Sequence, residues 1–113
     1  MTKTAFLFAG QGAQYLGMGR DLYDRCSIVK ETIDQASQVL GYDLRDLIDK
    51  EETKLNQTRY TQPAILATSV AIYRLLKEKG YQPDMVAGLS LGEYSALVAS
   101  GALDFEDAVA LVA

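Results

Sequence analysis

The sequence contains no histidine and no tryptophan, and it has a single cysteine, Cys26, among its 113 residues. Without histidine the chain cannot complete a Ser-His-Asp catalytic triad from its own residues. One cysteine and no histidine also exclude a zinc site built from the usual nitrogen and sulfur ligands. A lone cysteine forms no disulfide within the chain and is typical of a reducing compartment, and we expect Cys26 to be a small buried hydrophobic residue.

Positive charge is absent from the last part of the sequence. All 11 lysines and arginines lie in residues 1–80, whereas residues 81–113 carry five acidic residues, and the whole chain has a net charge of −4. The lack of a basic cluster argues against a nucleic-acid-binding function. No run approaches the roughly 18 apolar residues that a membrane span needs, and the N-terminus has the wrong flanks for a signal peptide. We therefore expect a cytoplasmic protein.

Apolar runs and helical periodicity alternate along the chain and predict an α/β fold with parallel strands. Residues 4–9 and 84–88 are short apolar runs typical of buried strands. Helices are expected over residues 21–40 with a break near Ser27, 44–48 behind a cap at Asp43, 63–79, 91–100, and 106–113 behind a cap at Asp104. Residues 49–60 are polar and are expected to be irregular.

The stretch 64–73 contains no charged residue, although it has a helical pattern. Pro63 suits the first position of such a helix, and a helix that is apolar nearly all round is expected to be buried all round. Two strands make a poor sheet by themselves. Residues 1–113 are therefore expected to form the N-terminal portion of a single, larger domain.

The sharpest motif is Gly88-Leu89-Ser90-Leu91-Gly92, which follows an expected strand and precedes an expected helix. A G-x-S-x-G pattern in this context predicts a nucleophile elbow, a tight turn that exposes the serine hydroxyl. Ser90 is then the candidate nucleophile. The N–H of Leu91, at the start of the helix, is the candidate first donor to an oxyanion. The alternative is a serine that only caps the helix, with flanking glycines by chance. Glu93 is expected to be a solvated or helix-capping acid rather than a base.

A glycine-rich loop, Gly10-Gln11-Gly12-Ala13-Gln14, follows the first expected strand. A dinucleotide fingerprint would need a third glycine where Tyr15 stands, so that interpretation fails. The loop is better placed to supply a second oxyanion donor, as the loop after an early strand does in serine α/β hydrolases. A plain glycine-rich turn remains the alternative, and Gln62 could be only a polar residue at a helix start.

Three segments occur together and in order, namely residues 8–14, residues 61–64 (Thr-Gln-Pro-Ala) and residues 88–97. With them the chain resembles the malonyl-CoA:acyl carrier protein transacylase family of bacterial fatty-acid synthesis, which has an α/β-hydrolase-like acyltransferase fold. The resemblance implies that Ser90 is the acylated serine. It also implies that Gln11 and Leu91 donate backbone N–H groups to the oxyanion and that Gln62 lines the substrate pocket.

The sequence departs from that family in two ways. Leu89 stands where a histidine often precedes the serine, but that histidine is not the general base. The base histidine and the arginine that binds the substrate carboxylate match nothing in residues 1–113. The resemblance therefore implies that residues 1–113 alone are inactive. The choice of malonyl as the acyl group also comes from the resemblance alone, because the residue that would bind the malonyl carboxylate is absent.

The implied reaction moves a malonyl group from CoA to the phosphopantetheine thiol of acyl carrier protein through a malonyl-Ser90 intermediate. The substrate is malonyl-CoA, and no metal or permanently bound cofactor is needed. Acyl carrier protein is the expected partner. The basic patch of this protein that binds the carrier is expected to lie outside residues 81–113. Three alternatives stay open: an acyltransferase domain of a polyketide synthase, an α/β hydrolase that uses water, and a non-catalytic scaffold that retains the serine turn.

Overall fold

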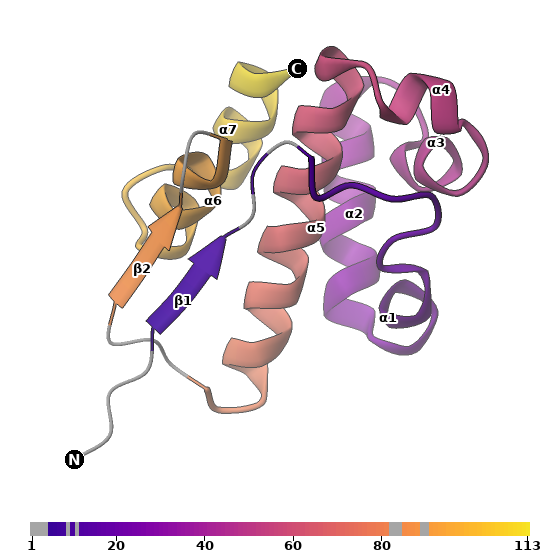
Figure 1. Cartoon of the computed structure of the whole chain (residues 1–113). Helices are drawn as coiled ribbons and strands as arrows, with labels where there is room; N and C mark the ends of the chain where they lie inside the picture. The colour runs from indigo at the N-terminus through magenta and orange to yellow at the C-terminus, as the bar shows by residue number, and fades with distance from the viewer. Residues whose placement is uncertain (1–4, 9, 11, 82–84, 89–90) are drawn as a thin grey trace.

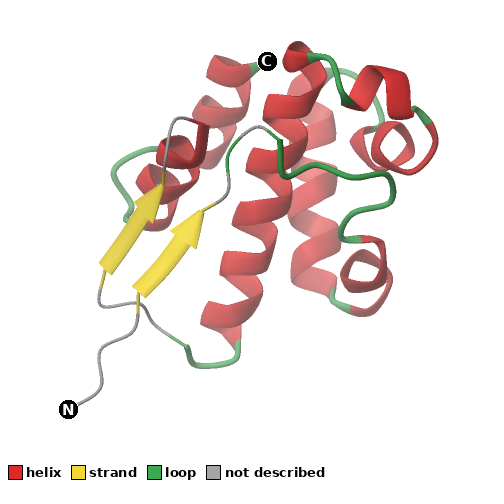
Figure 2. Ribbon diagram, in the orientation of Figure 1, coloured by secondary structure: helices red, strands yellow, loops and turns green. Residues whose placement is uncertain are grey.

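The computed structural model describes residues 5–8, 10, 12–81, 85–88 and 91–113, and it consists of two short strands at one side of a group of helices (Figures 1 and 2). The elements follow in the order β1 (Ala5–Phe8), α1 (Arg20–Arg25), α2 (Ser27–Leu40), α3 (Leu44–Lys50), α4 (Glu52–Leu55), α5 (Thr58–Glu78), β2 (Met85–Gly88), α6 (Leu91–Ala99) and α7 (Phe105–Val112). None of the described helices is long and apolar enough to cross a bilayer.

The two strands are hydrogen-bonded to each other and run parallel, in register from Ala5 opposite Met85 to Phe8 opposite Gly88. The parallel pairing expected from the sequence is thus confirmed for these residues, while residues 4, 9 and 84 of the expected strands lie outside the described part. Helix α6 contacts both strands and also α5. The Phe8 ring of β1 also packs edge-on against Tyr73 of α5, so the strands are joined to the helices through both α6 and α5.

The hydrophobic core lies mainly among the helices, and α5 is its central element. This helix contacts α2, α4, α6 and α7, and in Figure 1 it runs antiparallel to the two strands. Large side chains from several helices are fully buried around it, including Ile33, Leu44, Leu66, Val70 and Val109. Burial of this kind stabilises a fold by about 1.5–3 kcal/mol for each large apolar side chain.

Local signals at the helix ends are mostly confirmed. The expected break near Ser27 falls at Cys26, whose extended backbone separates α1 from α2. The Asp43 carboxylate accepts a hydrogen bond from the Asp46 N–H at 3.0 Å and so caps α3. Gly41 ends α2 in the left-handed region, at φ 82°. Asp104 precedes α7 as expected, but its side chain makes no capping hydrogen bond. Cys26 is only half-buried, not fully buried as expected.

The expectation that residues 49–60 are irregular was wrong. They contain α4 and the first turn of α5. The polar composition of this stretch conceals one fully buried anchor, Leu55. A single apolar residue gives no periodicity that a sequence pattern can detect, yet its burial against the core fixes this turn of helix.

Two expectations about α5 were also wrong. Pro63 is the sixth residue of the helix, not the first, because the helix already begins at Thr58. The helix is not buried all round either, since Ile72 is 37% exposed and Thr68 and Ser69 are half-buried. These three residues lie on one face of α5, along one side of a pocket.

Candidate functional site

The carboxyl ends of β1 and β2 lie side by side at one edge of the strand pair. Phe8 and Gly88, the last residues of the two strands, are direct partners in the parallel register. Ligands of parallel α/β sheets bind at this edge, where the loops emerge. The glycine-rich loop follows β1, and the Gly-Leu-Ser-Leu-Gly segment follows β2. The register therefore makes the two candidate segments start from neighbouring positions.

The connection from β2 to α6 is very short. β2 ends at Gly88 and α6 begins at Leu91, so only two residues, Leu89 and Ser90, separate the strand from the helix. Both lie outside the described residues. Leu91 is the first residue of α6, and N–H groups in the first turn of a helix have no partner inside that helix. Its backbone position agrees with the predicted role as an oxyanion donor, which stays a prediction.

The loop after β1 begins with a tight turn. The Ala13 N–H donates to the Gly10 carbonyl at 3.3 Å, and Gly12 has φ 108°, a conformation that favours glycine. Gln11, the second predicted oxyanion donor, lies outside the described residues. From this turn the loop crosses α5 towards α3 and α4 before it descends to α1 (Figure 1).

The second half of the loop is fixed to α3. The Gly17 N–H donates to the Ile48 carbonyl at 2.8 Å. The Arg45 guanidinium donates to the Met18 carbonyl at 2.7 Å and to the Asp49 carboxylate at 2.6 Å. Since Met18 and Arg45 are both buried, this half of the loop is part of the core.

Asp49 is ionised within this anchor. Partial burial opposes its charge, but hydrogen bonds from Arg45 and then Arg20 outweigh that effect and hold the pKa of the Asp49 carboxyl below its usual value. The Arg20–Asp49 pair is 2.8 Å long, and Arg20 is half exposed. One carboxylate thus joins a buried cation and an exposed cation.

Gln62, the predicted pocket residue, lies in the second turn of α5, near the end of the helix that faces the strand carboxyl ends (Figure 1). It is half-buried, and its side chain has no hydrogen-bond partner among the described residues. Helical spacing places it on the same face as Ile65 and Ser69. Gln62 thus lies on the face of α5 that borders the pocket, but it is not among the residues that line this pocket, and its role stays a prediction.

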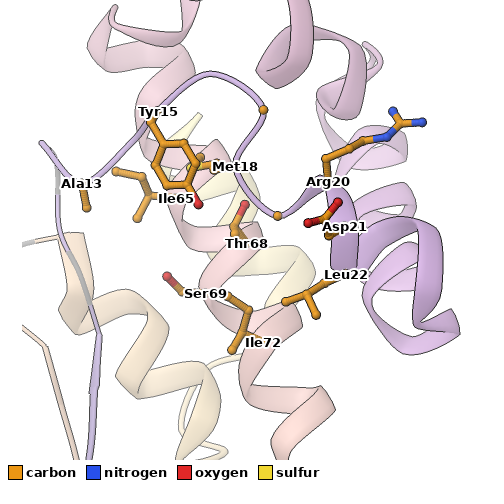
Figure 3. Close-up of a pocket in the computed structure, with 12 residues that line it drawn as sticks. Ala13, Tyr15, Met18, Arg20, Asp21, Leu22, Ile65, Thr68, Ser69 and Ile72 are labelled. Carbon is orange, nitrogen blue, oxygen red and sulfur yellow. The ribbon is translucent and has the colours of Figure 1, made fainter.

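A pocket of about 490 Å³ lies between this face of α5 and the loop (Figure 3). Its lining is Ala13, Tyr15, Gly17, Met18, Gly19, Arg20, Asp21, Leu22, Ile65, Thr68, Ser69 and Ile72. The Thr68 hydroxyl is buried and has no hydrogen-bond partner in the part of the chain that the structure describes. The wall is mostly apolar, with polar groups at Thr68 and Ser69 and charged groups at Arg20 and Asp21. Within the described residues, no group of three or more His, Cys, Asp or Glu side chains is arranged to hold a metal ion.

Residues 5–113 match the family described as the acyl transferase domain. The chain belongs to this family. It is 56% identical to the malonyl CoA-acyl carrier protein transacylase of Haemophilus influenzae, over 99% of this chain and 37% of the relative. It is 50% identical to the transacylase of the same name from Bacillus subtilis, over 96% of this chain and 35% of the relative.

Solved structures of relatives have the same fold over the same portion. The crystal structure of MCAT from Streptococcus pneumoniae is 92% identical, with a TM-score of 0.96, over 97% of this chain and 36% of that protein. A malonyl-transacylase solved in complex with a type II PKS acyl-carrier protein is 50% identical, with a TM-score of 0.94, over 98% of this chain and 37% of that protein. The described residues therefore have the acyltransferase fold, and the chain spans little more than a third of the relatives it matches.

Sequence reasoning missed the residues that hold the loop. Gln14 was part of the motif but was given no role, and Asn56 and Arg45 were not singled out. Gln14 and Asn56 are 42 positions apart, yet their side chains are hydrogen-bonded. Gln14 lies in the glycine-rich motif, but Asn56 lies in the polar stretch 49–60, which carries no motif, so no sequence signal reveals that these two residues meet.

Proposed function

We propose that this chain is the serine-bearing part of an acyltransferase that moves a malonyl group from CoA to the phosphopantetheine thiol of acyl carrier protein. The family supports acyl transfer, and the names of relatives at 56% and 50% identity support the malonyl group and the carrier. The single observation that carries the site is the pairing of Phe8 with Gly88, because both candidate segments start from that edge.

In the proposed first half-reaction, the Ser90 hydroxyl oxygen attacks the thioester carbonyl of malonyl-CoA. The carbonyl electrons move onto oxygen, and the N–H groups of Gln11 and Leu91 stabilise that negative charge. The tetrahedral intermediate then collapses, the carbon–sulfur bond breaks, and CoA leaves as the thiol that takes up the serine proton. The product is a malonyl ester of Ser90.

The second half-reaction uses the same groups. The phosphopantetheine thiol of the carrier attacks the ester carbonyl, the carbon–oxygen bond to Ser90 breaks, and the serine regains its proton. A covalent intermediate divides one exchange between two thiols into two steps at one site. Gln62 is proposed to line the pocket beside the acyl group, and no permanently bound cofactor takes part.

The proposal includes an elbow at Ser90 in an α/β-hydrolase-like domain of which residues 1–113 are the N-terminal portion. The general base is proposed to come from beyond these residues, since the sequence contains no histidine. The cation for the malonyl carboxylate is proposed to come from there too, since the arginine of the family matches no residue of the sequence. General-base catalysis contributes about 10²- to 10⁴-fold to rate. Residues 1–113 alone are therefore expected to be essentially inactive. A cytoplasmic site of action fits the unpaired Cys26.

Acyl carrier protein is the proposed acceptor. The charged side chains of residues 81–113 are all acidic, so a basic docking patch for an acidic carrier is proposed to lie elsewhere. One relative was solved with a carrier protein of type II PKS. Carriers of fatty-acid and polyketide type should therefore both be tested as acceptors, and the ratio of their kcat/KM values would identify the preferred class.

The test of the proposed function is covalent labelling of the full-length protein that carries this sequence. Incubation with malonyl-CoA should add one malonyl group at Ser90, and Ser90→Ala should abolish the adduct. Ser100→Ala is a matched control, since this exposed serine follows α6 and its hydroxyl donates to the Leu97 carbonyl at 3.0 Å. Peptide mass spectrometry locates the adduct, and its absence from Ser90 in the wild type would overturn the assignment.

The same preparation separates the alternative functions. An acyltransferase transfers the malonyl group to added carrier protein, whereas a hydrolase releases malonate at the same rate without any acceptor. A scaffold would keep its biological function after Ser90→Ala. The proposed function therefore predicts transfer that depends on both Ser90 and the carrier.

A further inference from the structure

We propose that Gln14 is a positioning residue, whose carboxamide holds the loop after β1 in the shape needed to bind the oxyanion, with Asn56 as its anchor. The inference rests on the proposed function, because it assigns Gln14 a role in the loop that carries the proposed oxyanion donor Gln11. Gln14 itself is not proposed to touch the substrate.

Three hydrogen bonds connect the loop to the end of α4. The Gly12 N–H donates to Gln14 Oε1 at 2.7 Å, and Gln14 Nε2 donates to Asn56 Oδ1 at 3.0 Å. Asn56 Nδ2 donates in turn to the Glu52 carbonyl at 2.9 Å. These contacts form one continuous chain from the α4 backbone to the Gly12 amide.

The Gln14 carboxamide has only one favourable orientation in this series of hydrogen bonds. Rotating the Gln14 amide by half a turn would place its NH₂ against the Gly12 N–H and its oxygen against Asn56 Oδ1. Each of those contacts is repulsive, since it pairs two donors or two acceptors. The hydrogen-bond network therefore assigns oxygen to the Gly12 side and nitrogen to the Asn56 side.

The loop at this point has little packing to hold it. Gly12 and Ala13 are exposed, and a Cβ added to Gly12 would meet no heavy atom within 4 Å. The described contacts that fix this turn are the Ala13 N–H to the Gly10 carbonyl and the Gln14 bridge. These contacts hold Gly10 and Gly12, the two neighbours of Gln11 in the chain.

Loosening this turn should affect the transition state more than substrate binding. A hydrogen-bond donor to an oxyanion acts only if it is held within about 0.5 Å of the productive position. A misplacement of about 1 Å can cost 10²-fold in rate. We therefore expect Gln14→Ala to lower kcat by about 10- to 100-fold, with little change in the KM for malonyl-CoA.

The experiment uses the full-length transacylase that carries this sequence, with three variants. Gln14→Ala removes the bridge, and Asn56→Ala removes its anchor. Asn56→Asp is the conservative control, because it keeps an acceptor oxygen for Gln14 Nε2, while a charged carboxylate oxygen replaces the group that donates to Glu52. We expect a low kcat for the two alanine variants and substantial recovery in Asn56→Asp. Hydrogen exchange at the Gly12 amide should be faster wherever kcat is low.

Wild-type kcat and wild-type exchange in Gln14→Ala would overturn the inference. Equal losses in Asn56→Asp and Asn56→Ala would overturn the anchoring role, because the bond to Glu52 would then explain both. Failure of the proposed function is distinguishable from these results. It would appear as a wild-type protein without a malonyl adduct on Ser90, whereas an adduct that forms equally fast in Gln14→Ala contradicts only the role of Gln14.

Discussion

The two halves of the loop between β1 and α1 are held in different ways. Residues 17–19 are held from inside, through the buried Arg45 guanidinium and the backbone of α3. Residues 10 and 12–14 are held at the surface, through the carboxamides of Gln14 and Asn56 and one turn. The first anchor combines charge with burial, whereas the second combines neutral hydrogen bonds with solvent exposure.

The two kinds of anchor should differ in what they affect, namely the stability of the fold and the shape of the loop. A buried, hydrogen-bonded ion pair is costly to break, because a charge is left in the interior. Exposed neutral hydrogen bonds contribute only about 0.5–1.5 kcal/mol each, because water replaces them. The buried anchor should therefore determine whether the protein folds. The exposed anchor should determine mainly the shape of the loop beside the proposed site.

The largest expected effect comes from breaking the buried anchor with Arg45→Met. The change leaves Asp49, only 15% exposed at its side chain, without its closest cation and leaves the Met18 carbonyl without a donor. The loss should be about 3–5 kcal/mol in the free energy of unfolding. Urea denaturation of the full-length protein measures it.

Arg20→Met is the matched control for that measurement. It removes a cation from the same carboxylate at a similar distance, but the Arg20 side chain is 51% exposed. Exposed pairs contribute far less to stability than buried ones, because water and salt screen their charges. Equal losses in Arg20→Met and Arg45→Met would show that burial is not what distinguishes the two contacts.

A smaller effect is expected from acid. The pKa of Asp49 is lowered in the folded state, by hydrogen bonds from Arg45 and Arg20 that outweigh its burial. Its contribution is therefore present above the unfolded pKa of about 3.9 and is lost as the pH falls through the lower folded value. The stability difference between the wild type and Asp49→Asn should be constant near neutral pH and should shrink below about pH 4. Denaturation series at several pH values test this, and a difference that grows in acid would contradict the assigned sign.

The smallest effect on stability should come from the exposed anchor. Asn56→Ala removes the contact with Gln14 and the donation to Glu52, both at the surface. The expected loss is about 1 kcal/mol in the free energy of unfolding, which is smaller than the loss expected for Arg45→Met. Urea denaturation measures both. A loss as large as that of Arg45→Met would mean that the two halves of the loop fold as one unit.

Local patterns predicted much of this architecture. The two short strands, the break between α1 and α2, the Asp43 cap and the Gly41 stop each depend on residues that are close in sequence. The patterns failed at α4 and at the start of α5. There a buried Leu55 and a buried Thr61 override a polar composition that is typical of loops.

The candidate site likewise has features that local sequence patterns predict and features that depend on tertiary contacts. The motif around Ser90 and the glycine-rich loop are short enough to be identified from spacing, and the family they suggested is confirmed. The roles of Ser90, Gln11, Leu91 and Gln62 stay predictions. The anchors of the loop could not be predicted, because Gln14 meets Asn56 and Arg45 meets Met18 only after distant segments have packed together.

The sequence by itself therefore determined the family, the order of the elements and the residues that are candidates for chemistry, since these follow from short motifs and from helix and strand periodicity. Only the tertiary structure decided that Phe8 lies beside Gly88 and that one face of α5 borders a pocket. It also decided which side chains hold the loop. The physical reason is that hydrogen bonding and burial depend on distance in space, which sequence separation does not measure.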